Sequence, residues 1–425
     1  MNLTRRDREM LDGCHGEGAR FAMSVVVRMA EAVGADELVS IEAAHIDACA
    51  LMSRSSLDVI DHLAENGARV SVPTTLSMVS LDLENWRYLG IEPAHAETAT
   101  RIANGYRALG CVPTWTCAPY QGYLTPRFGQ QLAWGESNAV AYANSVLGAR
   151  TNRYADYLDI CGAITGRVPK TGLHCTENRR ATLRVRVEGV READWASPAA
   201  WAALGAVVGS AVGERVPAIE GLSGLRPAND ALKAFGAAAA SFGSIGLFHF
   251  VGITPEAPDL TAACQGRPVS QTLDVTAAML RTAWGELSDA ALGSPVDAVI
   301  LGCPHASYAE FAALAGSIAR RPGAHVHDAV QLLVFASAPM VELARRGGLL
   351  EPLARFGATI VRDSCPFHAP IVAADAGTAM TDSAKCAYYA PGELDVRVAF
   401  GAKDDCVESA IAGRVCAREV PWRGR

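Results

Sequence analysis

The sequence contains twelve cysteines in 425 residues but no C-x-x-C pair. Cysteines at that spacing mark many zinc and iron–sulfur sites, so spacing alone predicts neither kind of site here. The first residues, MNLTRRDREMLDG, also lack the apolar run of a secretory signal. Many thiols without an export signal favour a reducing compartment, so we expect a cytoplasmic protein in which most cysteines are buried.

Clusters of Lys and Arg are absent as well, and the net charge is −7, so no nucleic-acid partner is expected. Residues 234–253 form a run without Asp, Glu, Lys or Arg, which is long enough to cross a membrane. However, the run is rich in Ala, Gly and Ser, and its character changes at Ser244. We therefore expect a buried helix followed by a strand, and no membrane partner.

A chain of 425 residues is long enough for two or three domains. Half of its residues are hydrophobic and a fifth are charged, which is typical of a globular protein. Breaks in the pattern near residues 190 and 295 predict the domain boundaries. We expect an N-terminal α/β domain (1–190), a middle domain or connector (191–295) and a C-terminal α/β domain (296–425).

The chain alternates between helical and strand-like patterns, beginning with Thr4 and Asp7, whose spacing is typical of a weak capping box. We expect helices at residues 20–32, 56–66 and 197–212, strands at 38–45, 69–72 and 181–188, and a connector at 215–230. This alternation predicts an α/β fold with mainly parallel sheets covered by helices.

The stretch 111–153 has the densest polar chemistry of the chain. Cys117 lies in a loop between Pro113 and Pro119, through which no helix can run. Glu136-Ser137-Asn138 then opens a run of helix formers, so these side chains are expected at a helix N-terminus, which favours anions. Arg150-Thr151-Asn152-Arg153 follows that helix. A binding or catalytic role is favoured, and a capped surface helix is the alternative.

Two apolar strands are expected in the last third, at Asp297–Leu301 and Ala358–Val361, and they are followed by Cys303-Pro304 and Cys365-Pro366. Ligands of open α/β sheets bind at the carboxyl ends of strands, so we expect these strands to be neighbours and their thiols to meet Cys117. Three thiolates could hold an iron–sulfur cluster with one iron open to a substrate oxygen. The alternative is three unrelated, packed thiols.

Seven runs, spread over residues 40–392, resemble the large subunit of the aconitase X family. They are PTWTCAPY, GESNAVAYANSVLGARTNR, TGRVPKTGLHCTENR, VGITPEAP, LGCPHAS, DSCP and TDSAKCAYYAPG. The resemblance implies an aconitase-like, multi-domain α/β dehydratase (a hydro-lyase) with an iron–sulfur cluster at the carboxyl ends of its strands. The cluster ligands would be Cys117, Cys303 and Cys365.

The family includes two activities, the dehydration of 5-phosphomevalonate and that of cis-3-hydroxy-L-proline to Δ1-pyrroline-2-carboxylate. The chain resembles the phosphomevalonate type at Glu136, Ser137 and Lys385 but departs from it at Ala48-Cys49-Ala50 and at Ser77-Met78. These departures remove hydrogen-bond donors for a phosphate, which favours hydroxyproline metabolism; the phosphomevalonate reaction is the alternative. In either case Glu136 would bind the substrate or move a proton, and Ser137 would hydrogen-bond to the substrate.

The substrate carboxylate needs a cationic partner, and Arg150, Arg153 or Lys385 could supply it, the arginines as bidentate forks and Lys385 as a point charge. Further candidates for substrate contacts are Asn152, His174 and His305. A histidine with a purely structural role is the more common case, so the two imidazoles rank below the cations.

Enzymes of the aconitase superfamily close their site with a smaller swivelling domain, whose Ser is the expected base. The sequence after Gly392 is too short for such a domain, so we expect a heteromer with a separate small subunit. Two rival functions use the same features. One is a non-catalytic scaffold with this fold, and the other is a zinc-dependent hydrolase that uses the three thiols.

Overall fold

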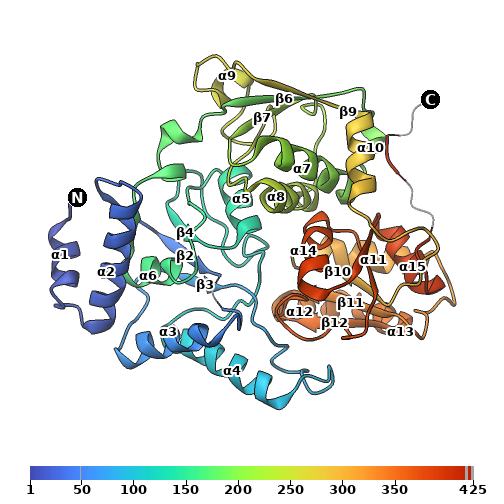
Figure 1. The fold of residues 1–425 in the computed structure, drawn as a ribbon, viewed down its shortest axis with the longest axis horizontal. Coiled ribbons are helices and arrows are strands. Elements are labelled where there is room, and N and C mark those ends of the chain that lie inside the picture. Colours follow the sequence, from blue (N-terminus) through green and yellow to red (C-terminus); the bar gives the residue numbers. More distant parts are fainter. Residues whose placement is uncertain (48, 417–419, 423–425) are drawn as a thin grey trace.

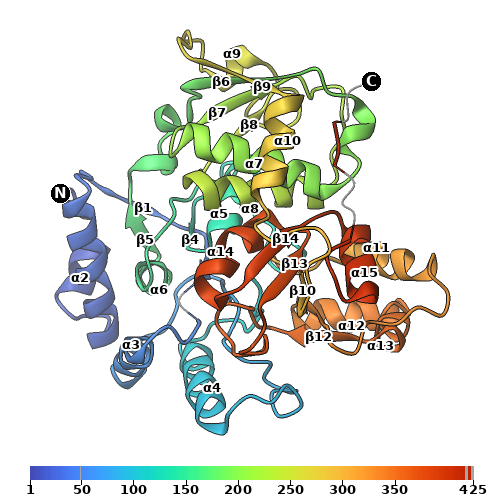
Figure 2. The ribbon, with the colours of Figure 1, turned by 45° about the vertical axis from the view of Figure 1, so that its right-hand side comes forward.

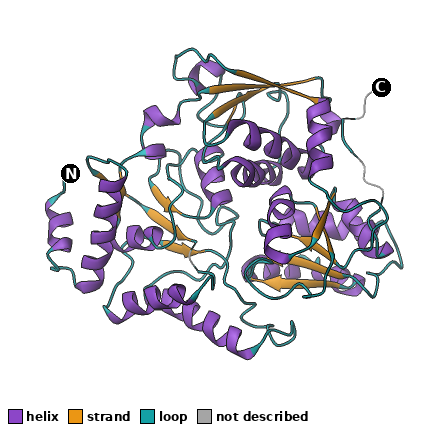
Figure 3. Cartoon of the chain, viewed as in Figure 1, coloured by secondary structure: helices purple, strands orange, loops and turns teal. Residues whose placement is uncertain are grey.

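The computed structural model describes residues 1–47, 49–416 and 420–422. The chain forms three α/β units, which Figure 1 shows in blue to green, green to yellow, and orange to red. Each unit combines helices and strands (Figure 3). In these described ranges, no helix has the length and apolar character needed to cross a lipid bilayer. The predicted α/β fold with mainly parallel sheets is confirmed.

The first unit comprises α1 (Arg5–Leu11), α2 (Glu17–Ala32), β1 (Leu38–Ser40), β2 (Ala43–Ile46), α3 (Arg54–Glu65), β3 (Thr74–Leu76), α4 (Pro93–Ala108), β4 (Leu132–Trp134), α5 (Ser137–Ser145), α6 (Leu158–Thr165), β5 (Arg167–Pro169) and two 3-10 turns, η1 (Gly172–His174) and η2 (Thr176–Arg179). Its three-stranded sheet is parallel, in the order β3-β2-β4, and β1 pairs with β5 in an antiparallel ribbon. Because the sheet is parallel, β2 and β4 end at the same edge.

The second unit comprises β6 (Leu183–Glu188), η3 (Glu192–Trp195), α7 (Pro198–Val212), β7 (Pro217–Glu220), α8 (Asn229–Gly243), β8 (His249–Phe250), α9 (Leu260–Ala263), β9 (Thr272–Thr276) and α10 (Ala277–Glu286). Its parallel sheet has the order β8-β7-β6-β9. The run 234–253 is therefore the end of α8 followed by β8, which confirms a helix and then a strand.

The third unit comprises β10 (Ala298–Leu301), α11 (Tyr308–Ala319), β11 (Gln331–Ala336), α12 (Ala338–Arg346), α13 (Leu350–Phe356), β12 (Ala358–Arg362), β13 (Thr378–Thr381), α14 (Ala384–Leu394), β14 (Arg397–Phe400) and α15 (Lys403–Ala412). Its five strands are all parallel, in the order β12-β11-β10-β13-β14. The strands β10 and β12, which precede the predicted thiols, therefore end at the same edge of one sheet.

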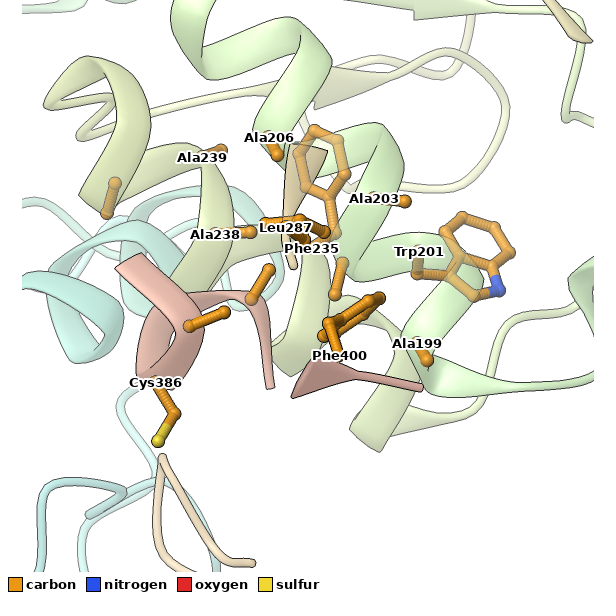
Figure 4. Packing of buried hydrophobic residues seen from close by; sticks show 14 of the residues in the cluster. Ala199, Trp201, Ala203, Ala206, Phe235, Ala238, Ala239, Leu287, Cys386 and Phe400 are labelled. Carbon is orange, nitrogen blue, oxygen red and sulfur yellow. The ribbon is translucent and has the colours of Figure 1, made fainter. Parts of the chain in front are cut away.

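A single hydrophobic core joins the second and third units. Small residues let α7 and α8 approach closely: a Cβ at Gly205 would lie 2.5 Å from the carbonyl oxygen of Phe235. Phe400 of β14 and Cys386 of α14 belong to the same core as Trp201 of α7 (Figure 4). Close packing of this kind resists deformation, so the second unit fixes the position of α14.

Several locally encoded features are confirmed. Thr4 and Asp7 form the predicted capping box, in which Thr4 Oγ1 accepts the N–H of Asp7 (3.2 Å) and Asp7 Oδ2 accepts the N–H of Thr4 (2.9 Å). Glu136 is the N-cap of α5, and its carboxylate accepts the N–H of Asn138 (3.1 Å). Each of these contacts spans only two or three residues of sequence, which is why the pattern reveals them.

The prediction of a single strand at residues 38–45 is wrong, because this segment forms two strands that belong to two different sheets. At the break, the N–H of Ile41 bonds to the carbonyl of Gly166, and the N–H of Glu42 bonds to that of Gln131. The backbone thus changes partners in the middle of an uninterrupted pattern. The alternation of side chains carries no information about which sheet each half joins.

Three other predictions about strands are also wrong. Residues 69–72 are not a strand, since the N–H of Val70 bonds to the carbonyl of Leu109, after the end of α4, and β3 begins only after Pro73. Residues 215–230, predicted as a connector, contain β7. Finally, β10 and β12 are not neighbours, because β11 lies between them.

Candidate active site

A cavity of about 280 Å³ lies between the first and third units. The segments that follow β2, β4, β10 and β12 form its walls together with α14. It therefore occupies the carboxyl ends of parallel strands from two sheets, the usual position of a ligand site in α/β proteins. Figure 2 shows α14 below α8 of the second unit, so all three units hold the walls in place.

The three predicted thiols, Cys117, Cys303 and Cys365, all line this cavity. They come from three separate loops. Sγ of Cys117 accepts a hydrogen bond from the backbone N–H of His305 (3.3 Å), which ties the first of these loops to the loop that carries Cys303. A further thiol, Cys386, is buried beside Cys303 and hydrogen-bonds to it. The structure thus brings the three thiols together.

The surroundings shift the pKa values of the three thiols in different directions. Burial raises the pKa of Cys117 to about 12 and that of Cys365 well above its ordinary range. The hydrogen bond with Cys386 lowers the pKa of Cys303. Because a metal binds the thiolate rather than the thiol, loading iron here would release protons from Cys117 and Cys365.

An ion pair crosses the cavity wall between the first and third units. Nζ of Lys385 lies 2.7 Å from Oε1 of Glu136, and the two side chains are only 12% and 5% exposed. Burial opposes charge on both groups. For Glu136, however, Lys385 and Asn138 outweigh burial and lower its pKa to about 2, and the carboxylate in turn raises the pKa of Lys385. Both side chains are therefore charged at neutral pH.

Asn138 links this ion pair to the thiol loop. Its amide donates to the carbonyl of Cys117 (2.9 Å) and to Oε1 of Glu136 (2.7 Å), and its own oxygen accepts the hydroxyl of Tyr120 (2.7 Å). Ser137 also donates to Oε1 of Glu136 (3.2 Å). The first turn of α5 therefore fixes the carboxylate and the Cys117 loop relative to each other.

His305, a candidate for a substrate contact, is held on both sides of its ring. The carbonyl of Ser364 can only accept, so Nε2 of His305 carries the proton and donates to it (2.7 Å). Nδ1 then accepts the hydroxyl of Thr116 (3.2 Å), and burial lowers the pKa of the ring to about 4. The neutral imidazole connects residues that immediately precede Cys117 and Cys365.

The cavity collects part of the predicted substrate-binding set. In addition to the ion pair, it is lined by Ala50, Met78, Ser137 and Arg153. Cys49 and Ser77 are fully buried; the thiol of Cys49 points to the carbonyl of Ile46, and the hydroxyl of Ser77 points to the sulfur of Met78. Ala48 lies outside the described residues.

Arg150, Asn152 and His174 are held in a separate network outside the described cavity walls. Arg150 donates to the carbonyl of His174 (3.1 Å), and Asn152 donates to the carbonyl of Thr171 (3.0 Å). In the His174 ring, Nδ1 faces Oε1 of Gln131 (2.6 Å) and Nε2 accepts the hydroxyl of Tyr154. These side chains hold the segment after α5 against η1, and the structure does not bring them to the thiols.

Sequence reasoning missed several residues that line the cavity. They are Asp47, Met52, Asp156, Phe367, His368, Tyr389 and Glu393. Tyr389 and Glu393 follow Lys385 at four-residue steps on α14, a spacing that puts them on one helix face and that the sequence already contained. Asp47 directly follows β2, so its position at the carboxyl end of a strand was a second available signal.

The residues present fit an iron–sulfur cluster by donor chemistry, because three thiols share one cavity with charged groups that could contact a substrate. In the described part of the chain, no three His, Cys, Asp or Glu side chains already stand in metal-binding geometry. The fit thus depends on the identity of the donors and on their common cavity. Soft thiolate ligands select zinc, copper(I) and iron–sulfur clusters.

Comparison with known proteins assigns most of the chain to one family. Three family models match in order: the aconitase X first domain at residues 1–177, the second domain at 181–285 and the third domain at 296–412. The chain is 45% identical to cis-3-hydroxy-L-proline dehydratase of Pseudomonas aeruginosa over 98% of this chain and 71% of that protein. It is 41% identical to the enzyme of the same name from Hypocrea jecorina, over 97% and 69%.

Similarity extends to proteins with another named substrate. The chain is 36% identical to the phosphomevalonate dehydratase large subunit of Methanothermobacter thermautotrophicus, over 92% of this chain and 94% of that one. Its fold matches the crystal structure of Thermococcus kodakaraensis aconitase X in its holo-form with a TM-score of 0.85 and 31% identity, over 96% of this chain and 100% of that one. The family resemblance is confirmed: this chain is a member of the aconitase X family, whose curated relatives named here are dehydratases.

Proposed function

We propose that this chain is the larger, cluster-bearing part of a cis-3-hydroxy-L-proline dehydratase. The observation that carries the proposal is the lining of one cavity, where three thiols meet both a guanidinium and several carboxyl groups. The relatives that share 45% and 41% identity with the chain bear this name, whereas a phosphomevalonate relative shares 36%.

The charges that line the cavity suit an amino acid. A hydroxyproline carries a carboxylate and a ring ammonium, and the cavity offers Arg153 for the first and Asp156 and Glu393 for the second. Opposite charges at contact distance attract, and like charges repel, by more than in bulk water when the site is partly buried. A phosphate dianion would meet these carboxylates as well as Glu136, so the lining opposes it.

The uncharged part of the lining supports the same substrate. Ala50, Met52 and Met78 present methyl, methylene and thioether groups to the cavity. None of these groups can donate a hydrogen bond, and a phosphate needs several donors to replace its water. A small ring without a phosphate would instead gain from apolar contact.

Cys117, Cys303 and Cys365 would hold the iron–sulfur cluster, which would supply Lewis acidity toward the departing hydroxyl group. Around it, Arg153 would orient the substrate through its carboxylate. Glu136, kept anionic by Lys385, would accept a hydrogen bond from the ring nitrogen. All twelve cysteines are free thiols, which supports a reducing, cytoplasmic compartment.

A smaller subunit would complete the enzyme. The chain covers 94% of the phosphomevalonate dehydratase large subunit, a name that implies a small partner, but 71% and 69% of the two hydroxyproline dehydratases. The unmatched share of the latter is large enough for one small domain. We infer that the corresponding swivelling domain supplies the base that removes the C2 proton and covers the cavity against water.

The substrate assignment is tested by assaying the iron-loaded chain together with the candidate small subunit on both compounds. Turnover of cis-3-hydroxy-L-proline is expected, with 5-phosphomevalonate rejected on the order of 10⁴-fold in kcat/KM, because a site without the matching donors discriminates strongly. Comparable kcat/KM values would refute the assignment. Full turnover by the chain alone would refute the need for a partner.

The metal assignment has its own test. Cys117→Ser, Cys303→Ser and Cys365→Ser should each lose bound iron and the visible absorption of the purified protein. Cys264→Ser is the matched control, because Cys264 is also buried (4% exposed) but packs in a separate cluster of the second unit. Equal iron content in all four variants would refute the ligand set. Stoichiometric zinc without visible absorption would favour the hydrolase, and a metal-free protein would favour the scaffold.

A further inference from the structure

Asp47 is a carboxyl group in the cavity that has no role in the function proposed above. It directly follows β2 and lines the cavity on the side of the first unit. Its Oδ1 is buried and has no hydrogen-bond partner among the described residues. A buried carboxyl oxygen normally has a partner, so an oxygen without one in a ligand cavity points to a group that acts on the ligand.

The backbone holds Asp47 firmly in this position. Its N–H donates to Oδ2 of Asp159 (2.7 Å), which is fully buried on α6. Gly135 passes so close that a Cβ there would lie 2.8 Å from Cβ of Asp47 and 3.0 Å from Oδ2 of Asp159. The absence of a side chain at position 135 therefore allows the two carboxyl groups to pack under the start of α5.

Acidic groups face Asp47 from each element packed against it. These are Asp159 on α6, Asp156 in the loop before it, and Glu136 at the start of α5. Lys385 on α14, the cation with the largest effect on Asp47, is already paired with Glu136, and Arg153 lines the same cavity. Burial, followed by the charges of Glu136 and Asp159, raises the pKa of Asp47 well above its ordinary range, and Lys385 offsets only part of this.

Asp47 and Glu136 therefore line one cavity with their pKa values shifted in opposite directions. The pKa of Glu136 is lowered to about 2, so this group is an anion at neutral pH, whereas burial and the neighbouring carboxyl groups favour the protonated form of Asp47. Carboxyl groups whose environments push their pKa values apart divide acid and base roles between them. A neutral carboxylic acid near the leaving group can donate a proton, which Glu136 cannot.

We propose that Asp47 is the proton donor to the departing hydroxyl group, an inference that rests on the dehydratase function proposed above. As the C3–O bond breaks, its electron pair stays on oxygen, and the proton of Asp47 completes a water molecule. The electron pair of the C2–H bond becomes the new C2=C3 bond, while the C2 proton passes to the base of the small subunit. Solvent then returns a proton to Asp47 and removes one from that base.

The test uses the iron-loaded complex with its small subunit. Asp47→Asn should lower kcat by about 100-fold or more, the usual contribution of general acid catalysis, with iron content and KM changed by less than threefold. Asp47→Glu, which keeps the acid on a longer side chain, should recover part of the loss. In the wild type kcat should fall at high pH as Asp47 ionises, and this limb should be missing in Asp47→Asn.

Asp61→Asn is the control, because it removes a carboxyl group that is 41% exposed on α3 and paired with Arg101 and that does not line the cavity. Its kcat and pH profile should match those of the wild type. A kcat of Asp47→Asn within threefold of the wild-type value would overturn the inference. An Asp47→Glu variant that is no more active than Asp47→Asn would overturn it as well. Loss of iron in parallel with activity also overturns it, because Asp47 would then be structural.

A second readout does not depend on turnover. The infrared spectrum of the wild type near pH 7 should contain the carbonyl band of a protonated carboxyl group that is missing in Asp47→Asn. If the wild-type complex fails to dehydrate cis-3-hydroxy-L-proline, the proposed function is refuted, and this band still decides the state of Asp47. Identical spectra for the two proteins would overturn the inference whether or not the enzyme is active.

Discussion

The buried ion pair between Glu136 and Lys385 provides a quantitative test of the site. Replacing Lys385 by Met removes the cation and leaves a carboxylate that is only 5% exposed without its charged partner. Breaking a buried pair by removing one member costs about 3–5 kcal/mol. Since Lys385 joins the third unit to the first, we expect this loss in the unfolding transition that separates them.

The matched control is Lys170→Met. Nζ of Lys170 lies 2.6 Å from Oε1 of Glu37, a similar distance, but its side chain and that of Glu37 are 46% and 50% exposed. Exposed pairs contribute about 0–1 kcal/mol because solvent screens them. The two variants therefore share the change from Lys to Met and differ in the burial of the pair.

Equilibrium urea unfolding followed by tryptophan fluorescence measures both effects, since Trp134 is buried two residues before Glu136. Iron content is measured in parallel, so that loss of the cluster is not mistaken for loss of the ion pair. Adding Glu136→Gln to Lys385→Met should restore part of the stability, because the stranded charge is removed as well. Equal destabilisation by Lys385→Met and Lys170→Met, or no recovery in the double variant, would refute the reasoning.

Three further outcomes are expected. Burial lowers the pKa of His174 to about 3, so below about pH 6.5 the unfolded state binds a proton that the folded state does not, and the stability of the protein falls with decreasing pH. His174→Gln should weaken this pH dependence of the urea midpoint between pH 8 and 5, and an unchanged pH dependence would contradict the prediction. Arg179→Met should lower the free energy of unfolding by about 3–5 kcal/mol, since the fully buried guanidinium of Arg179 donates through Nε to both carboxylate oxygens of Glu256, at 2.9 and 3.0 Å. A decrease below about 1 kcal/mol in urea unfolding would contradict the prediction. Gly302→Ala should lose most bound iron, since its φ is +83° and its Cβ would lie 2.1 Å from the carbonyl oxygen of Phe335; full iron content would disprove the constraint.

The local features of this protein were readable from its sequence. The Thr4 capping box and the start of α5 at Glu136 each depend on residues a few positions apart. Hydrogen bonds over such distances are set by residue type and spacing, so the pattern is sufficient. The motif resemblance also identified Glu136, Ser137 and Lys385, and all three line the cavity.

The partition into sheets was not readable. Residues 38–45 show one continuous strand pattern yet join two sheets, and β11 enters between β10 and β12. Strand partners are chosen over long distances in sequence, by packing that no local pattern records. The same limit explains Arg150 and His174, which looked like candidates for substrate binding but bond to each other and to their neighbours outside the cavity.

Sequence alone thus determined which groups this protein can use: three thiols beside prolines, a carboxylate at a helix N-terminus, and a late lysine. Tertiary structure alone decided which of them meet and in what state of charge. Lys385 keeps Glu136 anionic, although the two residues are 249 positions apart in the sequence. Burial among Asp159, Asp156 and Glu136 shifts the pKa of Asp47 in the opposite direction, because the pKa of a carboxyl group depends on the solvent and charges around it rather than on its place in the chain.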